Sequence, residues 1–124
     1  VIDGIKAFSP DLAVMLLPGG VAVDIAEKAG LRVIREAFAD RGYNPDGTLV
    51  SRREPGAVMH DPQDVAKRVL QVASTGSVTA IDGTEVIVQA ESVCVHGDSP
   101  GSVELTRSVV RKLADEGIRI EAVL

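Results

Sequence analysis

Hydrophobic positions along the chain alternate between short continuous runs and stripes at helical spacing. Short apolar runs bounded by Pro or Gly predict buried strands, and apolar residues three or four positions apart predict one face of a helix. Strands are predicted at residues 13–17, 31–37, 93–95 and 118–124. Helices are predicted at residues 1–8, 21–29, 61–75 and 99–116. This alternation predicts an α/β fold with parallel strands and right-handed crossovers, in which ligands bind at the carboxyl ends of the strands.

Cap residues and apolar stripes define the predicted helices more closely. Asp61-Pro62 and Ser99-Pro100 each place a capping side chain before a proline at the first helical position. Glycine often follows the last helical residue, because it adopts the left-handed conformation of this position without strain. The glycines expected to end helices are Gly30, Gly76 and Gly117. The residues expected to face the core are Val21, Ile25, Ala29, Val65, Val69, Leu70, Val72, Val103, Val110, Leu113 and Ala114.

Two segments interrupt the alternation. Residues 77–90 predict a β-hairpin with a two-residue turn at Asp82-Gly83. Residues 38–60 form a long irregular stretch that contains a turn signal at 44–47. Long loops inside compact domains are often functional, so polar residues in this stretch are candidates for a site.

Composition narrows the class of protein. The chain of 124 residues is 45% hydrophobic with only 2% aromatic residues, so aliphatic side chains must fill the core of one domain. The net charge of −5 argues against nucleic-acid binding, and no apolar run is long enough to span a membrane. The single cysteine, Cys94, excludes an internal disulfide. We expect a soluble cytoplasmic protein, and residues 1–8, which resemble the end of a helix already under way, predict further sequence before Val1.

A histidine and an aspartate follow the predicted strand at residues 93–95. His96 can act as a general acid or base, since imidazole exchanges protons near neutral pH. Asp98 can orient His96, bind a metal or accept a substrate donor, and Gly97 leaves room for a ligand. In an equally simple interpretation, Asp98 and Ser99 are turn and cap residues and His96 borders the core.

Charged residues also follow the predicted strand at residues 31–37. Glu36, late in this strand, and Asp40, just beyond it, can approach a common site. Arg41 and Arg52 can bind a carboxylate or phosphate through their guanidinium groups. The alternative is a solvated strand exit with a local Asp40–Arg41 pair and a solvated Arg52.

Four separate segments carry a family resemblance. Their residues are 36–43 (EAFADRGY), 46–52 (DGTLVSR), 55–61 (PGAVMHD) and 93–101 (VCVHGDSPG). In order and spacing they resemble the family of 5-oxoprolinase A subunits, also called LamB/YcsF. The chain is similar to roughly the C-terminal half of a family member. The Asp-Leu-Asn-Cys-Asp-Leu-Gly-Glu stretch and the histidine motifs of the N-terminal half do not occur in it.

The resemblance implies a fold, a reaction and partners. The fold is the C-terminal part of an irregular β/α barrel of the polysaccharide-deacetylase type, with mainly parallel strands and one hairpin insertion. The reaction is the ATP-dependent hydrolytic opening of 5-oxo-L-proline to L-glutamate, with Mg²⁺ accompanying ATP and with subunits B and C as partners. In this setting the expected catalytic residues are His96, Asp98, Glu36 and Asp40, and the expected substrate-binding residues are Arg41, Arg52 and Gly97.

Two alternatives belong to other classes. One is a metal-dependent deacetylase or hydrolase of carbohydrate-like substrates, which rests on analogy of fold and leaves the metal unspecified. The other is an inactive truncated fragment that associates with itself through unpaired sheet edges as a homo-oligomer. Bound metal in the full-length protein would support the first, and the size of the chain in solution tests the second.

Overall fold

The computed structural model describes residues 1–98 and 100–123. Its elements in chain order are α1 (Ile2–Phe8), β1 (Val14–Leu16), α2 (Val21–Lys28), β2 (Val33–Phe38), α3 (Pro62–Thr75), β3 (Ser77–Thr79), β4 (Glu85–Ile87), β5 (Ser92–Cys94) and α4 (Ser102–Asp115). The predicted helices, the first three predicted strands and the hairpin are confirmed. The fold is α/β with a mainly parallel sheet, as predicted.

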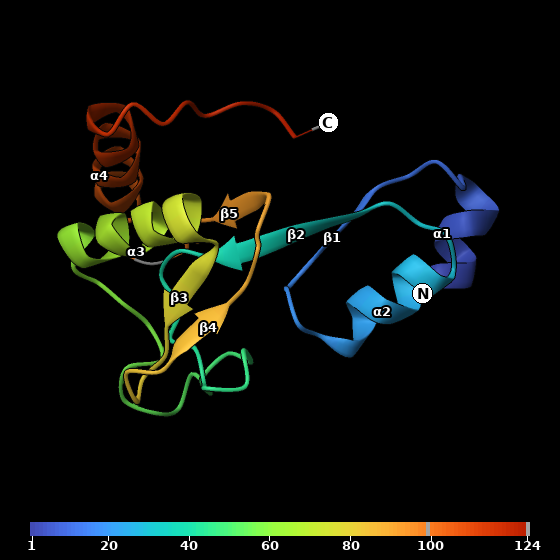
Figure 1. Cartoon of the computed structure of the whole chain (residues 1–124), viewed down its shortest axis with the longest axis horizontal. Helices are drawn as coiled ribbons and strands as arrows, with labels where there is room; N and C mark the ends of the chain where they lie inside the picture. Colours follow the sequence, from blue (N-terminus) through green and yellow to red (C-terminus); the bar gives the residue numbers. More distant parts are fainter. Residues whose placement is uncertain (99, 124) are drawn as a thin grey trace.

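β2 is the central strand of the parallel sheet, whose order is β1-β2-β5 (Figure 1). The first half of β2 pairs with β1, where Val33 lies opposite Val14, and the second half pairs with β5, where Phe38 lies opposite Cys94. α1 and α2 lie at the β1 end of β2, and α3 and α4 lie at its β5 end. Parallel strands joined in this way, with their carboxyl ends along one edge, form a partial β/α barrel.

Side chains of β2 alternate between a covered face and an open face of the sheet. On the covered face, Val33 is buried in a cluster with residues of α2, and Ala37 and Ala39 are buried in clusters that contain residues of α3. Glu36 and Phe38 point to the opposite face and are only partly buried. Ile34, earlier on that face, is buried, so the open face leaves side chains accessible along the half of β2 that pairs with β5.

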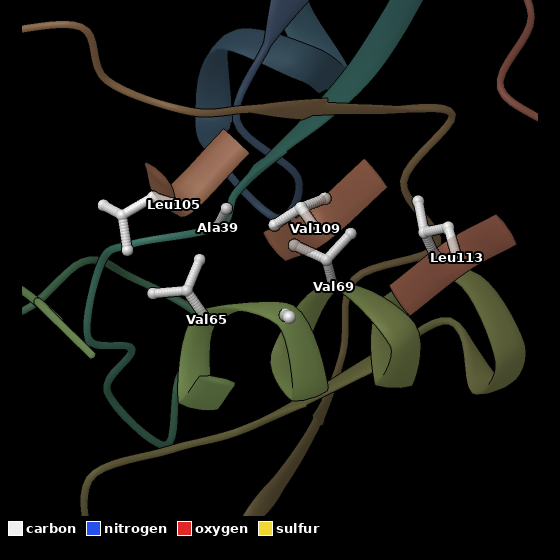
Figure 2. Packing of buried hydrophobic residues seen from close by; sticks show 7 residues of the cluster. Ala39, Val65, Val69, Leu105, Val109 and Leu113 are labelled. Atoms are coloured by element: carbon white, nitrogen blue, oxygen red, sulfur yellow. The ribbon is translucent and has the colours of Figure 1, made fainter. Parts of the chain in front are cut away.

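The main core cluster joins α3 and α4 to the end of β2 (Figure 2). Its buried members are Ala39, Val65, Ala66, Val69, Leu105, Val109 and Leu113. Burying each valine or leucine side chain contributes about 1.5–3 kcal/mol. The expectation that aliphatic residues form the core is confirmed, and this packing fixes the position at which β2 ends.

The predicted caps of α3 are confirmed. The side chain of Asp61 accepts hydrogen bonds from the backbone N–H groups of Gln63 and Asp64, and Pro62 occupies the first turn. Gly76 follows the helix in the left-handed conformation, with φ of 69°. Both ends of α3 are thus specified by local sequence, which places its apolar stripe against the sheet.

The predicted core faces of the other two long stripes are partly wrong. In α2, Val21 and Ile25 are exposed, whereas Val23 and Ala26 are buried. Both stripes have helical spacing, and packing against β1 and β2 selects the second. In α4, Leu113 is buried as predicted. The other predicted core residues, Val103, Val110 and Ala114, are exposed, because the stripe that meets α3 is Leu105, Val109 and Leu113.

Three predicted boundaries also need correction. α4 begins at Ser102 after Gly101, which has φ of 81°, whereas the predicted cap Ser99 lies outside the described residues. The hairpin loop has three residues, because the Ala80 N–H donates to the Thr84 carbonyl around Ile81-Asp82-Gly83. Residues 118–123 form no strand, since no described strand pairs with them.

Candidate active site

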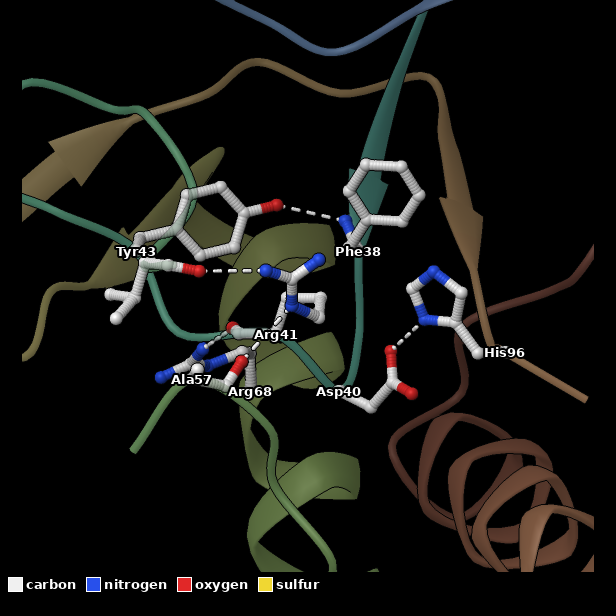
Figure 3. Close-up of polar contacts among 8 residues, drawn as sticks. Phe38, Asp40, Arg41, Tyr43, Ala57, Arg68 and His96 are labelled. Atoms are coloured by element: carbon white, nitrogen blue, oxygen red, sulfur yellow. Dashed lines mark hydrogen bonds and ion pairs between the residues drawn. The ribbon is translucent and has the colours of Figure 1, made fainter. Parts of the chain in front are cut away.

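The carboxyl ends of β2 and β5 bring two titratable side chains together (Figure 3). Asp40 comes two residues after β2, and His96 comes two residues after β5. His96 Nδ1 lies 2.6 Å from Oδ1 of Asp40. Only 1% of the Asp40 side chain is exposed, against 22% of the His96 side chain. The carboxylate is therefore buried behind an imidazole that reaches the surface.

The hydrogen bond determines how His96 presents its ring. An ionised carboxylate only accepts hydrogen bonds, so Nδ1 carries the proton when it donates to Asp40. In the neutral ring the other nitrogen, Nε2, then keeps a lone pair that points away from Asp40. A histidine oriented through Nδ1 by a buried carboxylate is arranged for general acid–base catalysis at Nε2.

Further groups lie on the open face beside this pair. The Phe38 ring stacks on the His96 ring, with centroids 5.1 Å apart and an interplanar angle of 18°. Nearer the start of the strands, the Ser92 hydroxyl donates to Oε1 of Glu36 at 3.3 Å. Burial, followed by the negative charges of Glu36 and Asp40, raises the pKa of the Cys94 thiol. Glu36, Asp40 and His96, three predicted catalytic residues, thus share one face of the sheet, on which Asp40 is buried.

Asp98 and Gly97 occupy a different position. Both are exposed on the turn after β5, where the Ser102 hydroxyl donates to the Gly97 carbonyl at 3.4 Å. A Cβ atom at Gly97 would meet no atom within 4 Å because the turn is exposed, and room for a ligand at Gly97 stays a prediction. Asp98 makes no hydrogen bond with the described residues, and Asp40 rather than Asp98 orients His96.

Arg41 is turned into the long loop. Its Nε donates to the Ala57 carbonyl at 3.0 Å and its Nη2 donates to the Val50 carbonyl at 2.7 Å. The side chain is buried, and the local Asp40–Arg41 ion pair considered from sequence is not formed. These contacts favour a role in shaping residues 41–58, and substrate binding by Arg41 stays a prediction. Arg52 is exposed on the same loop and forms no ion pair with the described residues.

Tyr43 and Arg68 complete the support of the loop. Tyr43 is fully buried, and its hydroxyl accepts a hydrogen bond from the Phe38 N–H at 2.8 Å. Arg68 of α3 stacks over the Tyr43 ring at 5.9 Å and donates to the carbonyls of Arg41 and Thr79. The pKa of the Tyr43 phenol lies above its ordinary value, because burial outweighs the opposing effects of the Phe38 hydrogen bond and of the positive charges of Arg68 and Arg41.

Sequence reasoning did not single out Phe38, Tyr43 or Arg68. A signal for Phe38 was available, because alternation along a strand places Glu36, Phe38 and Asp40 on one face. The roles of Tyr43 and Arg68 depend on contacts between segments distant in sequence, and no local pattern indicates them.

Two clefts of the structure lie away from the Asp40–His96 pair. Within residues 1–98 and 100–123, no group of three or more His, Cys, Asp or Glu side chains is placed to hold a metal ion. A cleft of about 290 Å³ lies between α3, α4, β5 and the C-terminal segment, and a shallower one of about 580 Å³ adjoins α4. Neither is lined by Asp40 or His96.

The architecture and the polar strand ends define a partial β/α barrel with its candidate site at the carboxyl edge of the sheet. The sequence profile of the LamB/YcsF family matches residues 1–124. The chain therefore belongs to the LamB/YcsF family, as the four segments indicated.

Individual relatives agree with this assignment. The chain is 61% identical over 124 residues to the 5-oxoprolinase A subunit of Corynebacterium jeikeium, covering 100% of this chain and 48% of the relative. It is 53% identical over 122 residues to the protein of the same name from Cutibacterium acnes, covering 98% of this chain and 48% of that relative. It also superposes on the crystal structure of a lactam utilization protein from Thermus thermophilus, with a TM-score of 0.90 and 40% sequence identity. The superposition covers 98% of this chain and 48% of that protein.

The match has a definite extent. The chain spans about half the length of the relatives and of the solved structure that it resembles. No helix in the part of the chain that the structure describes is long and apolar enough to cross a membrane.

Proposed function

We propose that the chain is a segment of an A-type subunit of 5-oxoprolinase, the hydrolase that opens 5-oxo-L-proline to L-glutamate with hydrolysis of ATP and together with partner subunits. Relatives named as 5-oxoprolinase A subunits support this reaction, and their designation as subunits supports a larger assembly. The observation that carries the proposal is the Asp40–His96 pair at the edge where a β/α fold binds its ligands.

The chemistry needs a base and an acid near the lactam carbonyl. In the proposed step, Nε2 of His96 takes a proton from a water molecule as the water oxygen attacks the ring carbonyl carbon. The imidazolium that forms is stabilised by the buried carboxylate of Asp40, at 2.6 Å from Nδ1. The C–N bond of the ring then breaks, the nitrogen takes up the proton, and the products are a carboxylate and an amine.

ATP would activate the resonance-stabilised lactam by phosphorylating the amide oxygen, because the carbonyl carbon is otherwise a poor target for water. The phosphoryl group would leave as inorganic phosphate, by hydrolysis, once water has opened the ring. The sequence contains neither the Walker pattern nor G-x-G-x-x-G, and Arg52 is an exposed guanidinium on the long loop. We assign the hydrolytic part of the reaction to this segment, with ATP and the accompanying Mg²⁺ as its proposed cofactors, and the Arg52 guanidinium would hold a carboxylate or a phosphate of the reactants.

The remaining predicted residues keep proposed roles. Glu36 would accept a hydrogen bond from a substrate N–H, because its carboxylate lies on the open face with one oxygen bonded to Ser92. Asp98 and Gly97 would border the substrate at the turn after β5, and Arg52 would attract its carboxylate. Arg41 would act through the loop that it holds.

The test is 5-oxoproline-dependent ATP hydrolysis by the full-length protein with its partner subunits. His96→Ala should lower kcat by about 10²–10⁴-fold, the usual contribution of a general acid–base residue. His60→Ala is the matched control, because His60 is the second histidine of the chain and is exposed. Equal turnover in the two variants would refute the proposed role of the pair.

A further inference from the structure

Phe38 and Asp40 hold His96 from two directions. Both belong to the open face of β2 and its extension, two residues apart, while His96 lies two residues beyond Cys94, the register partner of Phe38. Phe38 therefore sits diagonally before His96 and covers the face of its ring at 5.1 Å. Asp40 contacts the edge of the same ring through Nδ1.

The two contacts restrict different motions of the imidazole. A single hydrogen bond leaves the ring free to tilt and to swing away from Oδ1 of Asp40, because the χ2 preference of histidine is broad. A nearly parallel aromatic neighbour removes this freedom, since tilting the ring would separate the stacked faces. Together, Phe38 and Asp40 fix the direction in which Nε2 points.

The backbone of Phe38 is held by a hydrogen bond on the side of β2 that faces away from β5. The Ala39 N–H donates to the Cys94 carbonyl of β5, so the Phe38 N–H points to the opposite side of β2. On that side β1 has already ended at Leu16, and the hydroxyl of the fully buried Tyr43 accepts the hydrogen bond instead. The long loop thereby closes onto the residue that stacks on His96.

We propose that Phe38 is a positioning residue for His96 and that Tyr43 holds Phe38 in place, so that the two aromatic residues set the orientation of Nε2. The effect of Phe38 on turnover rests on the proposed function. Its effect on the imidazole depends only on the geometry of the folded chain, so the two can fail separately.

The experiment compares Phe38→Leu with Phe38→Tyr in the full-length protein with its partner subunits. Phe38→Leu should lower kcat by roughly tenfold to a hundredfold with KM little changed, because a small misplacement of a catalytic group has that effect. Phe38→Tyr, which keeps the aromatic face, should restore most of the loss. Nitrogen NMR of isotope-labelled histidine provides a second readout, with the His96 signals assigned by their absence in His96→Gln.

At a pH at which the imidazole is neutral, the expected NMR result is one tautomer of His96, protonated at Nδ1, in the unchanged protein and in Phe38→Tyr. Phe38→Leu should give a mixture of tautomers, because without the stacked ring the imidazole swings away from Asp40. Wild-type kcat and an unmixed tautomer in folded Phe38→Leu would overturn the inference. If Phe38→Leu fails to fold, Tyr43→Phe replaces it, and wild-type values of both readouts there would overturn it equally. If His96→Ala retains turnover, the proposed function fails, and the tautomer alone decides the positioning.

Discussion

Asp40 is the carboxylate that bonds His96, although Asp98 is only two residues from that histidine and Asp40 is 56 positions away. The pairing follows from the parallel register of β2 and β5, which carries their two extensions side by side. A strand pairing of segments distant in sequence has thus selected one of two candidate carboxylates.

This selection predicts different results for the two aspartates. Asp40→Asn should lower kcat for 5-oxoproline-dependent ATP hydrolysis by about 10²-fold or more, because the amide neither stabilises an imidazolium nor fixes the Nδ1 tautomer. Asp98→Asn should have a smaller effect, since Asp98 is exposed and lies apart from the pair. A larger loss in Asp98→Asn would assign the orienting role to Asp98.

Arg41 and Arg52 should also separate in stability measurements. Arg41→Lys should lower the free energy of unfolding by about 2 kcal/mol, because lysine cannot replace both guanidinium hydrogen bonds to Val50 and Ala57. Arg52→Lys should leave stability unchanged, as the side chain is exposed. Denaturant titration of both variants checks this. Unchanged stability of Arg41→Lys with a raised KM would instead support substrate binding by Arg41.

Gly42 should tolerate no side chain. A Cβ atom at this position would lie 2.4 Å from the Gly56 carbonyl oxygen, a backbone atom that cannot rotate away. Gly42→Ala should therefore destabilise the fold by about 1–3 kcal/mol, the usual effect of overpacking. Gly97→Ala is the control, because a Cβ atom there meets nothing within 4 Å. Equal melting temperatures of the two variants would contradict the packing described around Gly42.

The single tyrosine gives a pH-dependent prediction. Burial raises the pKa of Tyr43 above its ordinary value of 10.0, so the folded chain keeps its phenol proton to higher pH than the unfolded chain does. Between the two pKa values the unfolded state binds fewer protons, and stability falls as the pH rises through this window. The difference in ultraviolet absorbance between the protein and Tyr43→Phe should show a phenolate midpoint above pH 10.0. A midpoint at the ordinary value would show that the phenol is solvated.

Cys94 should react slowly despite lying on the open face. Burial and the charges of Glu36 and Asp40 raise the pKa of its thiol, so the reactive thiolate is scarce at neutral pH. Alkylation should be slower in the folded than in the unfolded protein, and it should accelerate in Asp40→Asn. Cys94→Ser identifies the signal that belongs to this thiol. Equal rates in the folded and unfolded protein would contradict the partial burial of Cys94.

Local sequence patterns predict much of the fold, whereas they do not predict which side chains of the site bond to each other. Asp61 and Gly76 predicted both ends of α3, and apolar runs predicted the three parallel strands. The face of α2 was mistaken because two stripes have helical spacing and only the sheet distinguishes them. His96 and Asp40 were each recognised as candidates, but their pairing depends on a register between distant strands that no local pattern specifies.

The central position of β2 in the sheet has a consequence for how the chain unfolds. Residues 33–35 of β2 pair with β1, and residues 36–38 pair with β5, so every pairing of the three-stranded sheet runs through this one strand. β1 or β5 can detach while the other strand stays paired with β2, whereas detachment of β2 breaks every strand pairing of the sheet. Hydrogen exchange should therefore be slowest at the paired amides of β2 and should report global unfolding there, while β1 and β5 exchange through smaller openings.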